Sequence, residues 1–115
     1  MVPLRFLAVL VAGSLFAGAA AAASPTLDRI KGSGTVTFGY RADAAPFSVR
    51  QRNGQVRGYS VELCEKVAVA LRKALNLPAL MVAWRPVDSE TRITAVASRD
   101  IDAECGTTTI TLSRM

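Results

Sequence analysis

The clearest pattern of apolar and polar positions in the chain lies in residues 58–77. Apolar residues recur there at steps of three and four, which is the spacing of one face of an α-helix. Ser60 is the expected N-cap, and Asn76 followed by Pro78 is a typical helix end. The pattern predicts a long amphipathic helix whose buried stripe contains Val61, Cys64, Val67, Ala68, Leu71 and Leu75.

Shorter patterns on both sides of this helix predict an alternation of strands and helices. The expected order is a helix at 26–31 capped by Thr26, a strand at 35–40, a hairpin with strands at 47–50 and 55–57, the long helix, a strand at 80–85, a helix at 88–97 and a strand at 101–104. The Asn-Gly pair at 53–54 is typical of a hairpin turn. Such alternation implies right-handed crossovers and a mostly parallel sheet, so the fold class is α/β.

The helix at 88–97 and the loop after the first strand complete the expected frame. Asp88 or Ser89 is expected to cap that helix, and its buried side is expected to contain Ile93, Val96 and Ala97. The loop that starts at Arg41 leaves the carboxyl end of the first strand, where open α/β sheets bind their ligands.

Residues 1–23 are typical of a secretory signal peptide. Arg5 supplies a positive start, residues 6–16 are apolar, and three alanines at 21–23 precede the expected cleavage site. The charge-free run at 6–23 is long enough to span a bilayer, so an uncleaved anchor is the alternative. Its alanine- and glycine-rich second half favours a signal peptide. We therefore expect export, a domain at residues 24–115, and no stable membrane insertion after cleavage.

Charge and cysteine content limit the chemistry. The net charge is +5, but the basic residues are scattered and not interleaved with aromatics, so nucleic-acid binding is not expected. Cys64 and Cys105 are the two cysteines, and in an exported protein such a pair indicates a disulfide, here one that joins helix to sheet. The chain has no histidine and no CxxC motif, which argues against a zinc site, a thioredoxin-like motif or a His-assisted nucleophile. We expect no catalytic residue, metal or cofactor.

Several linked motifs resemble the bacterial extracellular solute-binding proteins, family 3, which are periplasmic components of ABC importers for polar amino acids. The family signature begins with Gly, an aromatic or aliphatic residue, an acid, an aliphatic, an acid and an aliphatic. Residues 58–63 match it except at Ser60, where an acid is usual. The match is closest to the glutamate/aspartate-binding subgroup, which also shows such a Ser and a Cys in this helix. Other shared pieces cover Ile30-Lys31-x-x-Gly34, Gly39-Tyr40-Arg41, Pro46-Phe47-Ser48, Arg92-Ile93, and Ile101-Asp102-x-Glu104-Cys105-Gly106-Thr107-Thr108.

The resemblance implies a two-lobed, type II periplasmic-binding-protein-like fold of which residues 24–115 form the first part of lobe 1. It implies that Arg41 grips a ligand carboxylate, that Ser89 and Arg92 add contacts, and that Thr107 supplies a hydroxyl. Guanidinium groups suit such a ligand because they bind carboxylates bidentately. The alternatives are a solvated surface role for the arginines and a capping role for Ser89.

Relatives of this kind work with a membrane permease and bind ligand between two lobes. Because the second lobe would supply contacts, we expect the present chain to bind amino acid weakly or not at all alone. Phe47, Tyr59 and Trp84 are expected in the core, although Phe47 also follows the binding loop. The same fold carries prephenate-like dehydratases, for which Glu104 and Asp43 are acid–base candidates, and sensor domains of receptors. The expected location is the periplasm, and the expected class is a binding protein rather than an enzyme.

Overall fold

The computed structural model describes residues 24–115, so the expected signal peptide lies outside the described residues. The elements in chain order are α1 (Pro25–Ser33), β1 (Thr35–Tyr40), β2 (Asp43–Ala44), β3 (Ser48–Arg50), β4 (Val56–Arg57), α2 (Tyr59–Ala74), β5 (Met81–Pro86), α3 (Arg92–Ala97), β6 (Ala103–Cys105) and the 3₁₀ helix η1 (Leu112–Arg114). Within this part of the chain, no helix is both long enough and apolar enough to cross a membrane.

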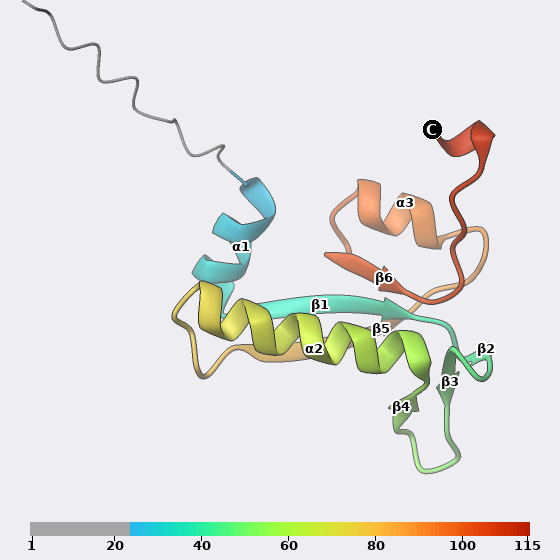
Figure 1. Cartoon of the computed structure of the whole chain (residues 1–115), viewed down its shortest axis with the longest axis horizontal. Helices are drawn as coiled ribbons and strands as arrows, with labels where there is room; N and C mark the ends of the chain where they lie inside the picture. The colour runs from blue at the N-terminus through green and yellow to red at the C-terminus, as the bar shows by residue number, and fades with distance from the viewer. Residues whose placement is uncertain (1–23) are drawn as a thin grey trace, which may run out of the picture.

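The main sheet has three parallel strands in the order β5-β1-β6. β1 lies in the centre, and the register places Phe38 opposite both Trp84 of β5 and Ala103 of β6. Figure 1 shows α2 lying along β1 and β5, while α3 lies beyond β6. The expected α/β class with a parallel sheet is confirmed. The chain passes through α2 between β1 and β5, and through α3 between β5 and β6. Such crossovers are needed because the end of one parallel strand and the start of the next lie at opposite edges of the sheet.

A second, antiparallel sheet in the order β2-β3-β4 stands beside the carboxyl end of β1 (Figure 1). The turn between β3 and β4 contains the expected Asn-Gly pair, with Gly54 at φ 83° and the Asn53 side chain accepting from the Gln55 amide. Strand β2 was not predicted from the sequence. It is only two residues long, and its pairing with β3 depends on how the loop after β1 folds back.

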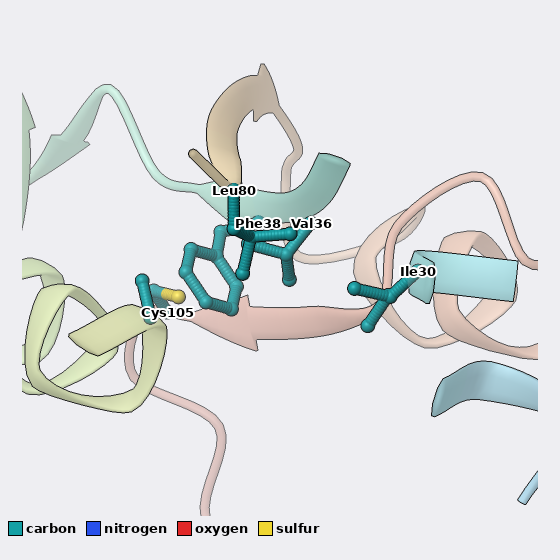
Figure 2. Close-up of a cluster of buried hydrophobic side chains, with 6 residues drawn as sticks. Ile30, Val36, Phe38, Leu80 and Cys105 are labelled. Carbon is teal, nitrogen blue, oxygen red and sulfur yellow. The ribbon is translucent and has the colours of Figure 1, made fainter. Parts of the chain in front are cut away.

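The hydrophobic core lies between the helices and the sheet, as Figure 2 shows. Cys64 and Leu71 of α2 and its C-cap Leu75 pack against it, as the predicted stripe requires, but Val67 is half exposed. Val67 lies at the margin of the stripe, beyond the width that a three-stranded sheet can cover. The buried cluster contains Ile30, Val36, Phe38, Ala68, Leu80 and Cys105.

The start of α2 differs from the prediction. Gly58 is the N-cap, and Ser60 is already inside the helix. The first helical amides donate to backbone carbonyls instead: Tyr59 N–H to Pro46 O (3.1 Å) and Ser60 N–H to Phe47 O (2.9 Å). This approach requires glycine at the cap, since Gly58 has φ 133° and a Cβ there would collide with the Phe47 backbone. The carbonyls of Pro46 and Phe47 thus accept the hydrogen bonds that a capping side chain would otherwise accept.

The other two helices also have caps that differ from those expected. In α1 the cap is Ser24, whose Oγ accepts from the Leu27 amide (3.4 Å), rather than Thr26. In α3 the cap is Thr91, and the helix starts at Arg92, four residues after Asp88.

The buried side of α3 differs from the prediction as well. Ile93, Val96 and Ala97 are exposed, while Arg92 is buried. The amides of Asp100 and Ile101 donate to the Ala95 carbonyl, so the chain turns back at Ala95. The side of α3 that holds Ala95 and Arg92 therefore faces the sheet.

The disulfide between Cys64 and Cys105 is confirmed. It joins the second turn of α2 to the end of β6, across 41 residues of chain. Trp84 packs as expected, with its ring centroid 5.4 Å from that of Phe38. Phe47 and Tyr59, in contrast, are not core residues, because 45% and 62% of their surfaces are exposed.

Candidate functional site

Three loops leave the same edge of the main sheet. The strands are parallel, so β1, β5 and β6 all end there, at Tyr40, Pro86 and Cys105. The loops carry Arg41, Ser89 and Thr107, and α3 presents Arg92. This edge is where an open α/β sheet exposes backbone ends and polar side chains to a ligand.

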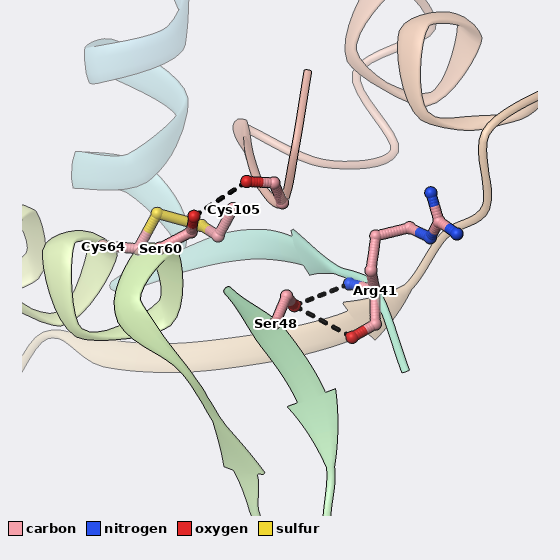
Figure 3. Close-up of a disulfide and its surroundings, with 6 residues drawn as sticks. Arg41, Ser48, Ser60, Cys64 and Cys105 are labelled. Carbon is pink, nitrogen blue, oxygen red and sulfur yellow. Dashed lines mark hydrogen bonds between the residues drawn. A yellow bond between two sulfur atoms is a disulfide. The ribbon is translucent and has the colours of Figure 1, made fainter. Parts of the chain in front are cut away.

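The backbone of Arg41 is fixed by Ser48. The Ser48 hydroxyl is fully buried; it accepts from the Arg41 amide (2.8 Å) and donates to the Arg41 carbonyl (2.9 Å). Figure 3 shows this double contact between β3 and the residue that follows β1. A buried hydroxyl with both roles satisfied holds its partner firmly. Sequence reasoning gave Ser48 no role, although the Pro-Phe-Ser motif contained it.

The Arg41 side chain already has partners. Its Nη1 donates to Ser89 Oγ (2.8 Å), so the structure brings these two predicted residues together. Its Nε and Nη2 both donate to Oδ1 of Asp43 (3.1 and 2.9 Å). The sequence named Asp43 only as an acid–base candidate and did not anticipate this ion pair.

Arg92 is buried, and within residues 24–115 part of its guanidinium group has no hydrogen-bond partner. The residue is 8% exposed, and neither Nε nor Nη1 has a partner within the described residues. A buried guanidinium normally keeps its donors satisfied, because desolvating a charge without compensation is costly. Nε and Nη1 are also out of contact with solvent, so an acceptor would reach them only if the side chains that cover them moved.

Thr107 lines a hollow of about 400 Å³ whose lining includes neither Arg41 nor Arg92. Phe47 and Tyr59 form its aromatic wall, and the Thr107 side chain is exposed. The loop starts from a fixed point, because Ser60 Oγ donates to the Gly106 carbonyl (2.7 Å), as Figure 3 shows. The structure thus links the helix signature to the Thr107 loop rather than to a helix cap.

Acidic groups balance part of the positive charge. One carboxylate oxygen of Glu104, Oε1, is buried without a hydrogen-bond partner among the described residues. A Cβ added at Gly106 would meet that oxygen and approach Arg41 Cγ to 3.1 Å, so Glu104 lies beside the Arg41 stem.

Asp88 orders the loop before α3. Its Oδ1 accepts from the amides of Glu90 (2.9 Å) and Thr91 (2.7 Å) and from the Thr91 hydroxyl (2.8 Å). These hydrogen bonds, first of all the one from the Thr91 amide, lower the pKa of Asp88 below its usual value, and Arg41 adds a smaller effect.

A larger hollow of about 620 Å³ lies elsewhere, between the hairpin, α2 and β5. Tyr40, Arg50, Arg57, Glu65 and Trp84 are among its lining residues, and none of the four predicted site residues is. Its size alone gives no reason to move the candidate site there. Residues 24–115 also contain no cluster of three or more His, Cys, Asp or Glu side chains able to hold a metal ion.

Comparison with known proteins decides the family. The sequence profile of the bacterial extracellular solute-binding proteins, family 3, matches residues 36–115. The chain belongs to this family. It is 46% identical over 85 residues to the L-glutamate/L-aspartate-binding protein of Pseudomonas aeruginosa, covering 73% of this chain and 28% of that protein. The chain spans about a third of the length of the curated relatives it matches.

Solved structures agree with the assignment of the fold. An ancestral amino-acid-binding protein, AncCDT-1, described as a precursor of cyclohexadienyl dehydratase, matches with a TM-score of 0.68 and 31% identity, over 79% of this chain and 37% of that one. An arginine-bound form of domain 1 from TmArgBP matches with a TM-score of 0.65 and 26% identity, over 76% and 63%. The type II periplasmic-binding-protein fold expected from the sequence is therefore confirmed.

Proposed function

We propose that this chain forms part of the first lobe of a periplasmic protein that binds an acidic amino acid and delivers it to an ABC importer. Family membership and the glutamate/aspartate-binding relatives support the ligand class. The expected signal peptide supports the periplasmic location, and the family supports a membrane permease as the partner. The finer assignment of residues rests on the geometry of the strand ends.

The observation that carries the proposal is the buried Arg92, of which two donor nitrogens, Nε and Nη1, have no partner among the described residues. A ligand carboxylate would supply the missing acceptors and the missing counter-charge together. Arg41 and Ser89 form a second donor pair on the neighbouring loop. Two guanidinium groups suit an amino acid with two carboxylates, and Thr107 adds a hydroxyl at the margin.

A mutant of domain 1 from TmArgBP has been solved in its arginine-bound form, which supports the idea that a first lobe alone can hold a ligand. The residues described here offer one side of a ligand only. We therefore expect binding weaker than about 0.1 mM, because part of the interaction energy would come from contacts that these residues do not supply. NMR titration of backbone amides with L-glutamate, L-aspartate, L-glutamine and L-arginine measures affinities in this range.

The decisive variant is Arg92→Met, which keeps the length of the side chain and removes its charge. It should abolish the shifts caused by glutamate and leave the unliganded protein equally or more stable, because an uncompensated buried charge is removed. A merely structural arginine would behave in the opposite way. Arg52→Met, at an exposed position in the hairpin turn, is the matched control and should bind glutamate normally. Unchanged glutamate binding by Arg92→Met would contradict the proposal.

A catalytic role is the second candidate. The precursor relation of AncCDT-1 to cyclohexadienyl dehydratase and the buried, unpartnered Glu104 Oε1 favour it. Such a role needs a proton-transferring group in the site, and Glu104 lies beside Arg41. Incubation with prephenate or a related cyclohexadienyl acid, followed by product analysis, separates the two functions. We expect no turnover, and turnover lost in Glu104→Gln would establish an enzyme.

A further inference from the structure

The carboxylate of Asp43 occupies the Arg41 head group in the manner of a ligand. Arg41 donates from Nε and Nη2 to one oxygen of Asp43, and it donates from Nη1 to the Ser89 hydroxyl. Paired N–H donation to a carboxylate is also how arginine recognises carboxylate ligands, although the bidentate fork uses both carboxylate oxygens and Asp43 accepts through one. Three of the five N–H groups of Arg41 are therefore already engaged from within the chain.

The two partners of this ion pair differ in freedom. The Arg41 side chain is 15% exposed, and its backbone is held by Ser48, whereas the Asp43 side chain is 73% exposed. Asp43 lies on β2, a strand of two residues. Rotation of an exposed side chain costs little, so Asp43 is the partner that leaves and Arg41 the one that stays.

We propose that Asp43 is an internal competitor for the Arg41 clamp, which an acidic ligand must displace. This inference rests on the function proposed above. It assigns Asp43 a role in specificity: only a ligand with its own carboxylate at this position replaces what Arg41 loses. A neutral amide at the same position would replace it poorly, because charge-assisted hydrogen bonds are roughly twice as strong as neutral ones.

The expected size of the effect follows from the exposure of the pair. An exposed ion pair changes an equilibrium by about two- to fivefold. Asp43→Asn, which keeps the shape and removes the charge, should therefore tighten glutamate binding about two- to fivefold. Asp43→Ala should tighten it at least as much. Binding of glutamine should change by less than twofold in both variants.

Glu90→Gln is the matched control. Glu90 is an exposed acid next to Ser89, and its carboxylate has no ion-pair partner among residues 24–115. This variant removes the same charge from the same neighbourhood without touching Arg41. If competition is the mechanism, Glu90→Gln should change glutamate affinity by less than twofold. An equal gain in Glu90→Gln and Asp43→Asn would reduce the effect to general electrostatics and overturn the inference.

A readout without ligand keeps the test independent of the proposed function. The Nε–H resonance of Arg41 should exchange with water faster in Asp43→Ala than in the unchanged protein, because its acceptor is gone. An identical exchange rate would show that the contact is not formed in solution, which ends the inference while leaving the proposed function intact. Weaker glutamate binding by Asp43→Ala would mean that Asp43 orients Arg41 for the ligand, and it also overturns competition. If neither the unchanged protein nor Asp43→Ala binds any of the four amino acids, both proposals are overturned.

Discussion

Asp102 and Thr37 exchange two hydrogen bonds between β1 and the residue that precedes β6. The Asp102 amide donates to the Thr37 carbonyl (2.7 Å), and the Thr37 amide donates to Oδ2 of Asp102 (2.8 Å). The other carboxylate oxygen of Asp102 forms an ion pair with Arg29 of α1. One buried side chain, 3% exposed, thus continues the β1–β6 ladder and attaches the first helix to it.

This arrangement predicts that Asp102→Ala destabilises the protein by about 2–4 kcal/mol, because a partly buried amide and a partly buried guanidinium both lose their acceptor. Denaturation by urea, followed by circular dichroism, measures the change. Asp100→Ala is the control: Asp100 pairs with Arg85 at 3.7 Å, both side chains are more than half exposed, and the loss should stay below about 1 kcal/mol. Equal losses in the two variants would contradict the structural role of Asp102.

Removal of the disulfide is expected to cost about 4 kcal/mol. The loop between Cys64 and Cys105 spans 41 residues, and the chain-entropy model gives this value for a loop of that length. The double variant Cys64→Ala/Cys105→Ala should unfold at lower urea, and dithiothreitol should lower the midpoint of the unchanged protein to a similar value. Dithiothreitol should not affect the double variant. If dithiothreitol left the urea midpoint of the unchanged protein as it was, the disulfide would contribute nothing to stability.

The turn before α3 should loosen in acid. The pKa of Asp88 is lowered in the folded protein, chiefly by the hydrogen bond from the Thr91 amide. A lowered folded pKa means that the interaction stabilises the fold fully above the unfolded value of 3.8 and is lost as pH falls through the folded value. The amide resonances of Glu90 and Thr91 should therefore titrate below pH 3.8. In Asp88→Asn the same resonances should show no acid transition of their own.

Two glycines of the chain are expected to respond in opposite ways to alanine. Gly58→Ala combines a left-handed backbone angle with a collision against the Phe47 backbone, so it should cost at least about 2 kcal/mol. Gly32 lies inside α1 with no atom near its missing Cβ. Gly32→Ala should stabilise by about 0.5–1 kcal/mol through helix propensity. Thermal unfolding of both variants checks the sign of each change.

The sequence allowed the sheet, the long helix and the disulfide to be predicted because each depends on a local period or on a simple count. The stripe of α2 repeats along a helix of 16 residues, about four turns, and two cysteines in an exported chain have one pairing. The predicted helix caps were wrong for a different reason. Ser60 looks like a cap in isolation, but its hydroxyl bonds to Gly106, 46 residues away, and the first helical amides bond to the turn between β2 and β3.

The candidate site, too, could be predicted only in part from the sequence. The resemblance identified Arg41, Ser89, Arg92 and Thr107, and the structure places the first two in contact. The burial of Arg92 was not predictable, because the apolar pattern at Ile93 and Val96 points to the opposite side of α3. Asp43 stands only two residues from Arg41, but the direction of its side chain depends on the pairing of β2 with β3. Their ligand roles stay predictions.

The double attachment of α2 to the end of β6 has a thermodynamic consequence for recognition. Ser60 and Cys64, one helical turn apart, hold the neighbouring residues Gly106 and Cys105, the first by a hydrogen bond and the second by a covalent bond. The loop that carries Thr107 therefore begins at an anchored point, and its ordering entropy is lost when the protein folds rather than when a ligand arrives. In the proposed function, the family signature at the start of α2 would favour affinity because it orders the start of this loop before a ligand binds.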